Sequence, residues 1–209
     1  MTAESAGRLL AELTFKEAQA AVAANAVVLV PIGATEAHGP HLPLGTDVLL
    51  SEEVARRTAR ELASSQTPSV IAPSLAYAVT EFGADFAGTV SLDAATAQGL
   101  YVGVMRGLLR AGFRKLCLVN SHLEPAHIEV LRASCAEVER QTGAKVAFPD
   151  QTSRRWARTL SDEYKRGNCH AGRYESALIL ATRPELCNEE IRRGLAENSA
   201  DFLGAVKGG

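Results

Sequence analysis

The chain has 209 residues, 46% hydrophobic and 22% charged, as in an ordinary globular protein with enough residues for one core. A formal net charge of −2 gives neither the basic surface that nucleic acids require nor a polybasic membrane anchor, and no apolar run approaches the roughly 20 residues that span a bilayer. The N-terminal stretch lacks the pattern of a secretory signal and the four cysteines form no Cys-x-x-Cys pair, so we expect a cytoplasmic protein with reduced thiols.

The first half of the chain alternates between apolar runs and amphipathic stretches. Residues 26–33 form a short β-branched run, which predicts a strand buried on both faces of a parallel sheet. After a loop rich in Gly and Pro, residues 47–63 carry apolar side chains at helical spacing. Residues 69–77 predict a second strand, and Asp93 is placed to cap a helix over 94–112.

The second half continues this alternation. Residues 115–120 predict a third buried strand, a helix follows from Pro125 to Gly143, and residues 145–150 predict a fourth strand. The polar stretch 151–169 shows no core-facing pattern and is interpreted as a surface insertion or lid. Two further helices are predicted over 173–182 and 188–197.

Strands that alternate with helices predict an α/β fold with a mostly parallel sheet, and we expect residues 1–209 to form a single domain. In such sheets the reactive groups gather beyond the carboxyl ends of the strands. Two segments rich in His and carboxylates, 34–47 and 120–124, follow predicted strands directly. The sequence therefore places a candidate site at this edge of the sheet.

The candidate site contains five side chains that bind metals in other proteins. Glu36 and His38 are two residues apart, as are His122 and Glu124, so in extended chain each pair presents a carboxylate and an imidazole on the same side. Asp47 adds a carboxylate where the first loop enters its helix. Five N and O ligands are too many for one closed zinc site and suit two divalent cations that share the aspartate. The absence of Cys from these segments favours zinc, manganese or iron over copper.

Several assignments stay open at this level. Spacing does not choose between His38 and His41 as a ligand, and His127 is also available. Asn120 and Ser121 are predicted to orient ligands rather than to bind a cation.

A further segment offers acid–base groups. His170 and Glu175 lie before or in the first turn of the helix over 173–182, where they offer a base for a water proton and an acid for a leaving amine. As an alternative, Glu175 is only a first-turn carboxylate that the helix dipole stabilises. Cys169 is a weaker candidate nucleophile, because the side chains of sequence neighbours such as Cys169 and His170 diverge.

Four motifs, in this order, resemble the creatininase (creatinine amidohydrolase) family: PIGATEAHGPHLPLGTD, FAGTVSL, VNSHLE and HAGRYES, which begin at residues 31, 86, 119 and 170. The resemblance implies a three-layer α/β/α fold, a dinuclear metal centre and a homo-oligomer, usually a hexamer built as a trimer of dimers. It implies that Glu36 and His122 bind one cation, that His38 and Glu124 bind the other, and that Asp47 bridges them. It also implies that His170 and Glu175 form the acid–base pair.

We therefore expect an amidohydrolase that cleaves a C–N bond of a small amide, such as a cyclic one, by metal-bound hydroxide. Trp156, Arg155 and Tyr174 are candidates for shaping the substrate pocket. Alternative functions are a formamide deformylase or a peptidase of cofactor biosynthesis, a metal-dependent isomerase or lyase, and a metal-binding protein without catalytic activity.

Overall fold

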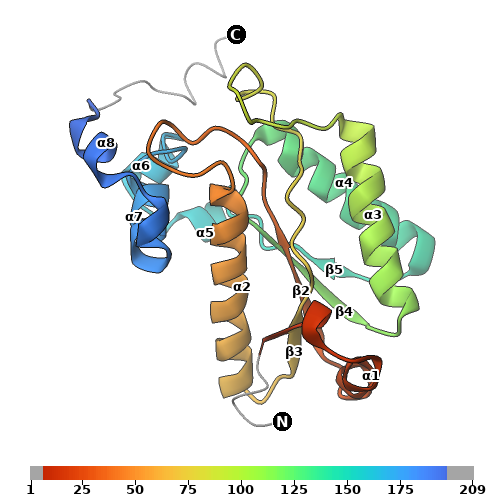
Figure 1. The fold of residues 1–209 in the computed structure, drawn as a ribbon. Coiled ribbons are helices and arrows are strands. Elements are labelled where there is room, and N and C mark those ends of the chain that lie inside the picture. The colour runs from red at the N-terminus through yellow and green to blue at the C-terminus, as the bar shows by residue number, and fades with distance from the viewer. Residues whose placement is uncertain (1–6, 197–209) are drawn as a thin grey trace.

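The computed structural model describes residues 7–196, apart from the side chains of Arg154 and Trp156, and contains a parallel sheet with strand order β1–β3–β2–β4–β5 (Figure 1). The strands are β1 (Arg8–Leu9), β2 (Val27–Ile32), β3 (Ser69–Ile71), β4 (Lys115–Asn120) and β5 (Val146–Ala147). The helices are α1 (Phe15–Ala23), α2 (Thr46–Ser64), α3 (Ala94–Arg110), α4 (Pro125–Thr142), α5 (Arg154–Ala157), α6 (Asp162–Lys165), α7 (Arg173–Thr182) and α8 (Glu189–Gly194), with 3₁₀ turns η2 (Leu10–Glu12) and η3 (Pro184–Leu186).

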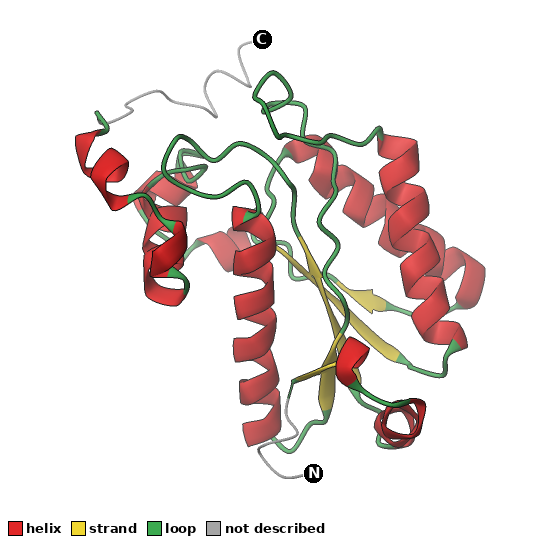
Figure 2. Cartoon of the chain, in the orientation of Figure 1, coloured by secondary structure: helices red, strands yellow, loops and turns green. Residues whose placement is uncertain are grey.

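Helices cover both faces of the sheet, with α2 on one side and α1, α3 and α4 on the other (Figure 2). The central strand β2 shows why its sequence is continuously apolar. Val28, Val30 and Ile32 pack into the core shared with α3 and α4, whereas Leu29 packs against Ala55 of α2 on the opposite face. Because both faces of the strand are buried, alternation of polar and apolar residues is lost. The predicted three-layer α/β/α class is confirmed.

Most predicted elements are found, with some differences in length. The strand predicted over 115–120 is β4, and the helix predicted over 173–182 is α7. The strand predicted over 69–77 ends at Ile71, after which the chain continues beside β2 through an isolated bridge between Leu75 and Ile32. The helix predicted over 188–197 is the shorter α8, and residue 197 itself lies outside the described residues. Within residues 7–196, no helix is long and apolar enough to cross a membrane.

The N-terminal elements β1 and α1 were not predicted, although α1 has a clear start signal. The Thr14 side chain accepts a hydrogen bond from the Glu17 amide, and the Glu17 carboxylate accepts one from the Thr14 amide. This reciprocal arrangement is a capping box, which satisfies amide donors that the first helical turn leaves unpaired. The Thr-x-x-Glu spacing was therefore a usable signal for α1.

The carboxyl ends of the strands carry the segments of interest. The loop after β2 arches over this edge and leads into α2, whose first turn contains the buried Asp47 (Figure 1). A Cβ atom on Gly33 would lie 2.5 Å from the Val48 nitrogen and 2.6 Å from the Asp47 carbonyl carbon. Only glycine at position 33 therefore allows the end of β2 to press against the start of α2.

The segment 151–169 contains α5 and α6, and most of its described side chains are exposed or half-buried. Tyr164 is buried, and the Glu163 carboxylate accepts hydrogen bonds from the amides of Arg173 (2.8 Å) and Tyr174 (3.0 Å). Glu163 thus caps the start of α7 and helps to position that helix. That the segment acts as a lid stays a prediction.

Candidate metal centre

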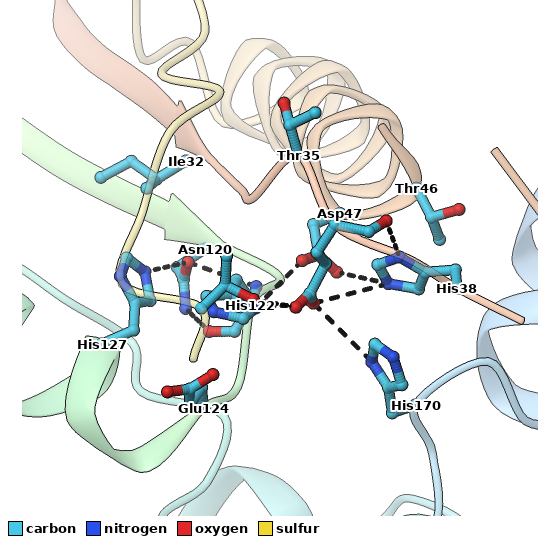
Figure 3. Close-up of polar contacts among 12 residues, drawn as sticks. Ile32, Thr35, His38, Thr46, Asp47, Asn120, His122, Glu124, His127 and His170 are labelled. Carbon is cyan, nitrogen blue, oxygen red and sulfur yellow. Dashed lines mark hydrogen bonds and ion pairs between the residues drawn. The ribbon is translucent and has the colours of Figure 1, made fainter. Parts of the chain in front are cut away.

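Four of the predicted ligands lie together beyond the carboxyl ends of β2 and β4. Glu36 and His38 come from the loop after β2, Asp47 from the first turn of α2, and His122 from the loop after β4. All four side chains are buried, with His38 fully enclosed. Figure 3 shows His38 and His122 on either side of Asp47.

The two oxygens of Asp47 face different imidazoles. Oδ1 lies 3.2 Å from His38 Nε2, and Oδ2 lies 3.1 Å from His122 Nδ1. Glu36 Oε1 lies 3.1 Å from the same His122 nitrogen and 3.9 Å from His38 Nε2. Asp47 Oδ2 is fully buried, and the His122 imidazole is the ionisable group beside it. A buried carboxylate in this position is stabilised only by positive charge, which a protonated imidazole or a cation can supply.

Backbone carbonyls determine which nitrogen of each histidine faces the carboxylates. His122 Nε2 donates to the Val79 carbonyl at 2.8 Å, and His38 Nδ1 donates to the Glu36 carbonyl at 3.1 Å. Once these nitrogens carry the protons, His122 Nδ1 and His38 Nε2 are the atoms left to bind a proton or a cation. Holding the second nitrogen in this way is the usual arrangement around metal-binding histidines.

The pKa values of these groups show that the centre favours positive charge. Burial opposes protonation of His38, but the hydrogen bond and charge of Asp47, with help from Glu175 and Glu36, raise its pKa to about 9. Burial also opposes protonation of His122, but hydrogen bonds and charge from Asp47 and Glu36 raise its pKa well above the usual range. Burial would raise the pKa of Asp47, but both imidazoles hold it well below its usual range. Protons on the imidazoles therefore neutralise the carboxylates in the metal-free protein, and divalent cations would take their place.

Within the described residues, three sets of side chains bring ligand atoms within 4.8 Å of one another. These sets are Glu36–Asp47–His122, His38–Asp47–Glu175 and Glu36–His38–His170. The first set contains the residues predicted to hold one cation. In the second set Glu175 takes the position beside His38 and Asp47 that was predicted for Glu124. Asp47 belongs to both sets, as a bridging ligand must.

Glu124 is set apart from the other predicted ligands (Figure 3). Its carboxylate accepts hydrogen bonds from the amides of Glu81 (3.2 Å) and Phe82 (3.3 Å). It belongs to none of the ligand sets formed by the described residues. The structure therefore does not bring Glu124 together with His38, and its role as a ligand stays a prediction.

The predicted acid–base pair lies at the same centre. Glu175 is buried in the first turn of α7, where Oε2 accepts from the Ala171 amide at 2.6 Å and lies 3.6 Å from His38 Nε2. Burial raises the pKa of Glu175 to about 8, against the opposing charge of His38. His170 is half exposed; its Nε2 donates to the Ala37 carbonyl at 3.0 Å, which leaves Nδ1 3.7 Å from Glu36 Oε1.

Cys169 is poorly suited to act as a nucleophile. The residue is buried, and burial, followed by the charge of Glu175, raises the pKa of its thiol to about 12. The thiolate is the reactive form of cysteine, so this thiol is almost entirely inactive near neutral pH.

The two histidines left open by spacing have other partners. His41 Nε2 forms a 2.9 Å hydrogen bond with Ser176 Oγ and so ties the loop after β2 to α7. His127 Nε2 donates to Asn120 Oδ1 at 3.0 Å. The Asn120 side chain also accepts from the His122 amide (3.3 Å) and donates to the His122 carbonyl (2.6 Å). Neither His41 nor His127 joins a ligand set among the described residues.

Residues 79–82, which follow β3, also hold side chains of the centre, and the sequence did not predict this contribution. The Val79 carbonyl holds His122, the Thr80 hydroxyl donates to Glu36 Oε2, and the next two amides hold Glu124. The neighbouring FAGTVSL motif was the nearest signal, but nothing in its pattern points to these contacts.

The centre opens into a cleft with a volume of about 1670 Å³. Its lining includes Glu36, Asp47 and His122 as well as residues of α6 and α7. Phe82 and Phe86, which are 56% and 64% exposed, line another part of the cleft. The cleft therefore offers both the polar centre and apolar surface to a ligand.

Comparisons with solved structures show the same fold. A crystal structure of creatinine amidohydrolase (creatininase) aligns with a TM-score of 0.71 and 29% identity over 88% of this chain and 75% of that one. A structure described as creatininase Mn aligns with a TM-score of 0.69 and 30% identity over 87% of this chain and 75% of that one.

Sequence comparisons agree. The chain is 32% identical to creatinine amidohydrolase of Pseudomonas putida over 186 residues, which are 84% of this chain and 72% of that protein. It is 30% identical to the mycofactocin precursor peptide peptidase of Mycobacterium ulcerans over 187 residues, 87% of this chain and 69% of that protein. The family model described as creatinine amidohydrolase matches residues 11–206. The chain therefore belongs to the creatininase family.

Proposed function

We propose that the protein is a metal-dependent amidohydrolase that binds two divalent cations per chain and hydrolyses a C–N bond of a small amide. The observation that carries this proposal is the position of Asp47, whose two oxygens face the available nitrogens of His38 and His122. A carboxylate shared by two ligand sets suits a pair of cations better than a single one.

The donor set fits such cations. One cation would be held by Glu36, Asp47 and His122. The other would be held by His38 and Asp47 with Glu124 as the further carboxylate, which leaves Glu175, beside the same two residues, available for proton transfer. These donors suit zinc, manganese or iron. Glu124 remains a proposed additional ligand, in competition with the two amides that hold its carboxylate.

When bound, two divalent cations lower the pKa of water and polarise a carbonyl oxygen. The chain supplies the proton transfers. We assign Glu175 as the proton acceptor, because its carboxylate lines the cleft and lies beside His38 and Asp47, two of the residues that would hold the cations. His170 is assigned as the donor to the departing nitrogen, because its fixed Nε2 leaves Nδ1 as the atom that exchanges the proton.

A peptidase activity is the second candidate. The cleft of about 1670 Å³ exceeds the roughly 300–1,000 Å³ of typical small-molecule pockets. The similarity to a peptide peptidase over 87% of the chain favours the same possibility. A substrate panel of creatinine, other cyclic amides, N-formyl compounds and short peptides distinguishes the two activities.

We also propose that the protein is a homo-oligomer, a hexamer built as a trimer of dimers. Leu44, Phe82, Phe86 and Val90 are exposed large apolar side chains from two neighbouring loops, and such surface is often covered by a partner. Light scattering on the purified protein measures the mass directly, and a monomer at micromolar concentration would contradict this assignment.

Metal analysis of protein purified without chelator tests the proposed function. We expect about two equivalents per chain in the wild-type protein, and loss of both in Asp47→Asn, because this residue belongs to both ligand sets. Folded wild-type protein without metal would refute the proposal. Once a substrate is found, reaction in oxygen-18 water separates hydrolysis, which places the label in the product, from an isomerase or lyase reaction.

A further inference from the structure

We propose that Thr80 is a positioning residue that fixes Glu36 as a one-oxygen ligand of the cation site shared with His122. This inference rests on the proposed function, since it concerns how the chain prepares one of the two cation sites. It assigns a role to a segment that no motif marks.

The contact between Thr80 and Glu36 is buried on both sides. The Thr80 side chain is fully enclosed, Glu36 is 3% exposed, and the Thr80 hydroxyl donates a hydrogen bond to Glu36 Oε2. The other oxygen, Oε1, lies 3.1 Å from His122 Nδ1, 3.7 Å from His170 Nδ1 and 3.9 Å from His38 Nε2. The hydroxyl therefore occupies one oxygen and leaves the other to face the centre.

Thr80 is itself held in place by the segment that follows. Its amide donates to Ser91 Oγ at 3.0 Å, and the Leu92 amide donates to the Ala78 carbonyl at 2.8 Å. Ala78 and Ser91 form an isolated parallel bridge. The hydroxyl is thus presented from a backbone that is itself hydrogen-bonded at residues 78 and 80.

The support is specific to one cation site. Val79 holds His122 through its carbonyl and Thr80 holds Glu36 through its hydroxyl, so two consecutive residues hold two ligands of the same site. In the other site, His38 is held by the backbone carbonyl of Glu36, a contact that does not involve the Glu36 carboxylate. Loss of the Thr80 hydroxyl should therefore weaken one site and spare the other.

The physical effect of removing the hydroxyl follows from burial. Glu36 Oε2 would lose its donor in a position that water cannot easily reach, and the carboxylate would be free to rotate. Removing such a supporting hydrogen bond typically reduces metal affinity by about 10–100-fold.

Thr80→Val tests this proposal, because it replaces the hydroxyl by a methyl group of similar size. Thr80→Ser keeps the hydroxyl and is the rescue variant. Thr35→Val is the matched control, since the Thr35 hydroxyl donates to the Ala76 carbonyl at 2.9 Å and has no hydrogen bond to a proposed ligand. Thr80→Ala removes the same hydroxyl and preserves the comparison if the valine variant does not fold.

The measurement is titration of metal-free full-length protein with Mn²⁺, followed by the paramagnetic resonance signal of the free ion. We expect one of two equivalents to bind about 10–100-fold more weakly in Thr80→Val. We expect Thr80→Ser and Thr35→Val to match the wild-type protein. A change in spectrum of the bound ion in Thr80→Val would further support altered coordination by Glu36.

The possible failures are distinguishable. If Thr80→Val and Thr80→Ala bind two equivalents of metal as tightly as the wild-type protein does, this inference is overturned. The proposed function would still stand. Equal weakening of both equivalents, or no rescue by Thr80→Ser, would also overturn it, because the effect would then be general. A wild-type protein that binds no Mn²⁺ or Zn²⁺ would overturn both proposals.

Discussion

The strongest test of the proposed metal centre is the effect of pH on metal binding by the metal-free protein. His38 has a pKa of about 9 and His122 one well above its usual range, because Asp47 and Glu36 surround them with negative charge. At pH 7 both imidazoles therefore carry a proton at the nitrogen that faces the centre. A cation must displace these protons before it can bind.

The size of the effect follows from the His38 pKa. A pH of 7 is about two units below the His38 pKa of about 9, and each pH unit corresponds to about 1.36 kcal/mol. Removing this one proton therefore costs about 2.7 kcal/mol, or about 100-fold in apparent affinity. Since protons leave more readily as pH rises, affinity should increase by about tenfold per unit for each displaced proton up to about pH 9.

Calorimetric titration with Zn²⁺ in buffers of different ionisation enthalpy measures the number of protons released and the affinity for the cation. We expect the release of at least one proton per chain at pH 7 and a steep rise in affinity between pH 6 and 9. Affinity that is independent of pH, with no proton released, would refute the view that the imidazoles are protonated by their carboxylate neighbours.

Folding stability should change over the same range. The folded-state pKa of His38 is about 9 and its unfolded value about 6.5, so the folded protein binds this proton more tightly. Its contribution, about 3 kcal/mol, is fully present below pH 6.5 and is lost as pH rises through about 9. The pKa of Glu175 is also raised, to about 8, so ionisation of this group likewise lowers the free energy of unfolding as pH rises. Chemical denaturation of the metal-free protein measures this loss, and a free energy of unfolding that rises over this range would contradict it.

Three further predictions follow from individual contacts. Glu124→Gln should retain more metal than Asp47→Asn, because only Asp47 belongs to the ligand sets; equal losses by elemental analysis would contradict this. Gly33→Ala should cost at least about 1–3 kcal/mol in thermal unfolding, because its Cβ would meet backbone 2.5 Å away. The control Gly99→Ala, with nothing within 4 Å, should stabilise α3 by about 0.5–1 kcal/mol, and similar values for both would remove the steric explanation. Thr14→Ala removes the cap of α1 and should cost about 1 kcal/mol by denaturant unfolding, with no effect on metal content.

The differences between expectation and structure are concentrated in places where local pattern carries little information. The strand over 69–77 was predicted from an apolar run, but the regular strand is only Ser69–Ile71, which pairs with β2 and, through Val70 and Ile71, with β1. The helix α1 was missed because its amphipathic stripe is short, even though the spacing of Thr14 and Glu17 marks its start. Such local signals are weak individually and are decided by packing against the rest of the protein.

Periodicity and residue type were enough to indicate the α/β class, the parallel sheet and the edge at which the candidate site lies. These features follow from burial, because a strand covered on both faces must be continuously apolar, as β2 is and as residues 116–119 of β4 are. The four motifs also indicated the family, and the ligand candidates stood at the ends of those strands. For these questions the sequence was sufficient.

The choice among candidate side chains depended on the tertiary structure. His38 faces Asp47 whereas His41 contacts Ser176, and Glu175 lies beside His38 whereas Glu124 is held by backbone amides. These outcomes depend on side-chain direction and on segments far apart in the chain, which spacing along one loop does not encode. Only the packed protein determines which nitrogen of a histidine is held by a carbonyl and which is free to bind a cation.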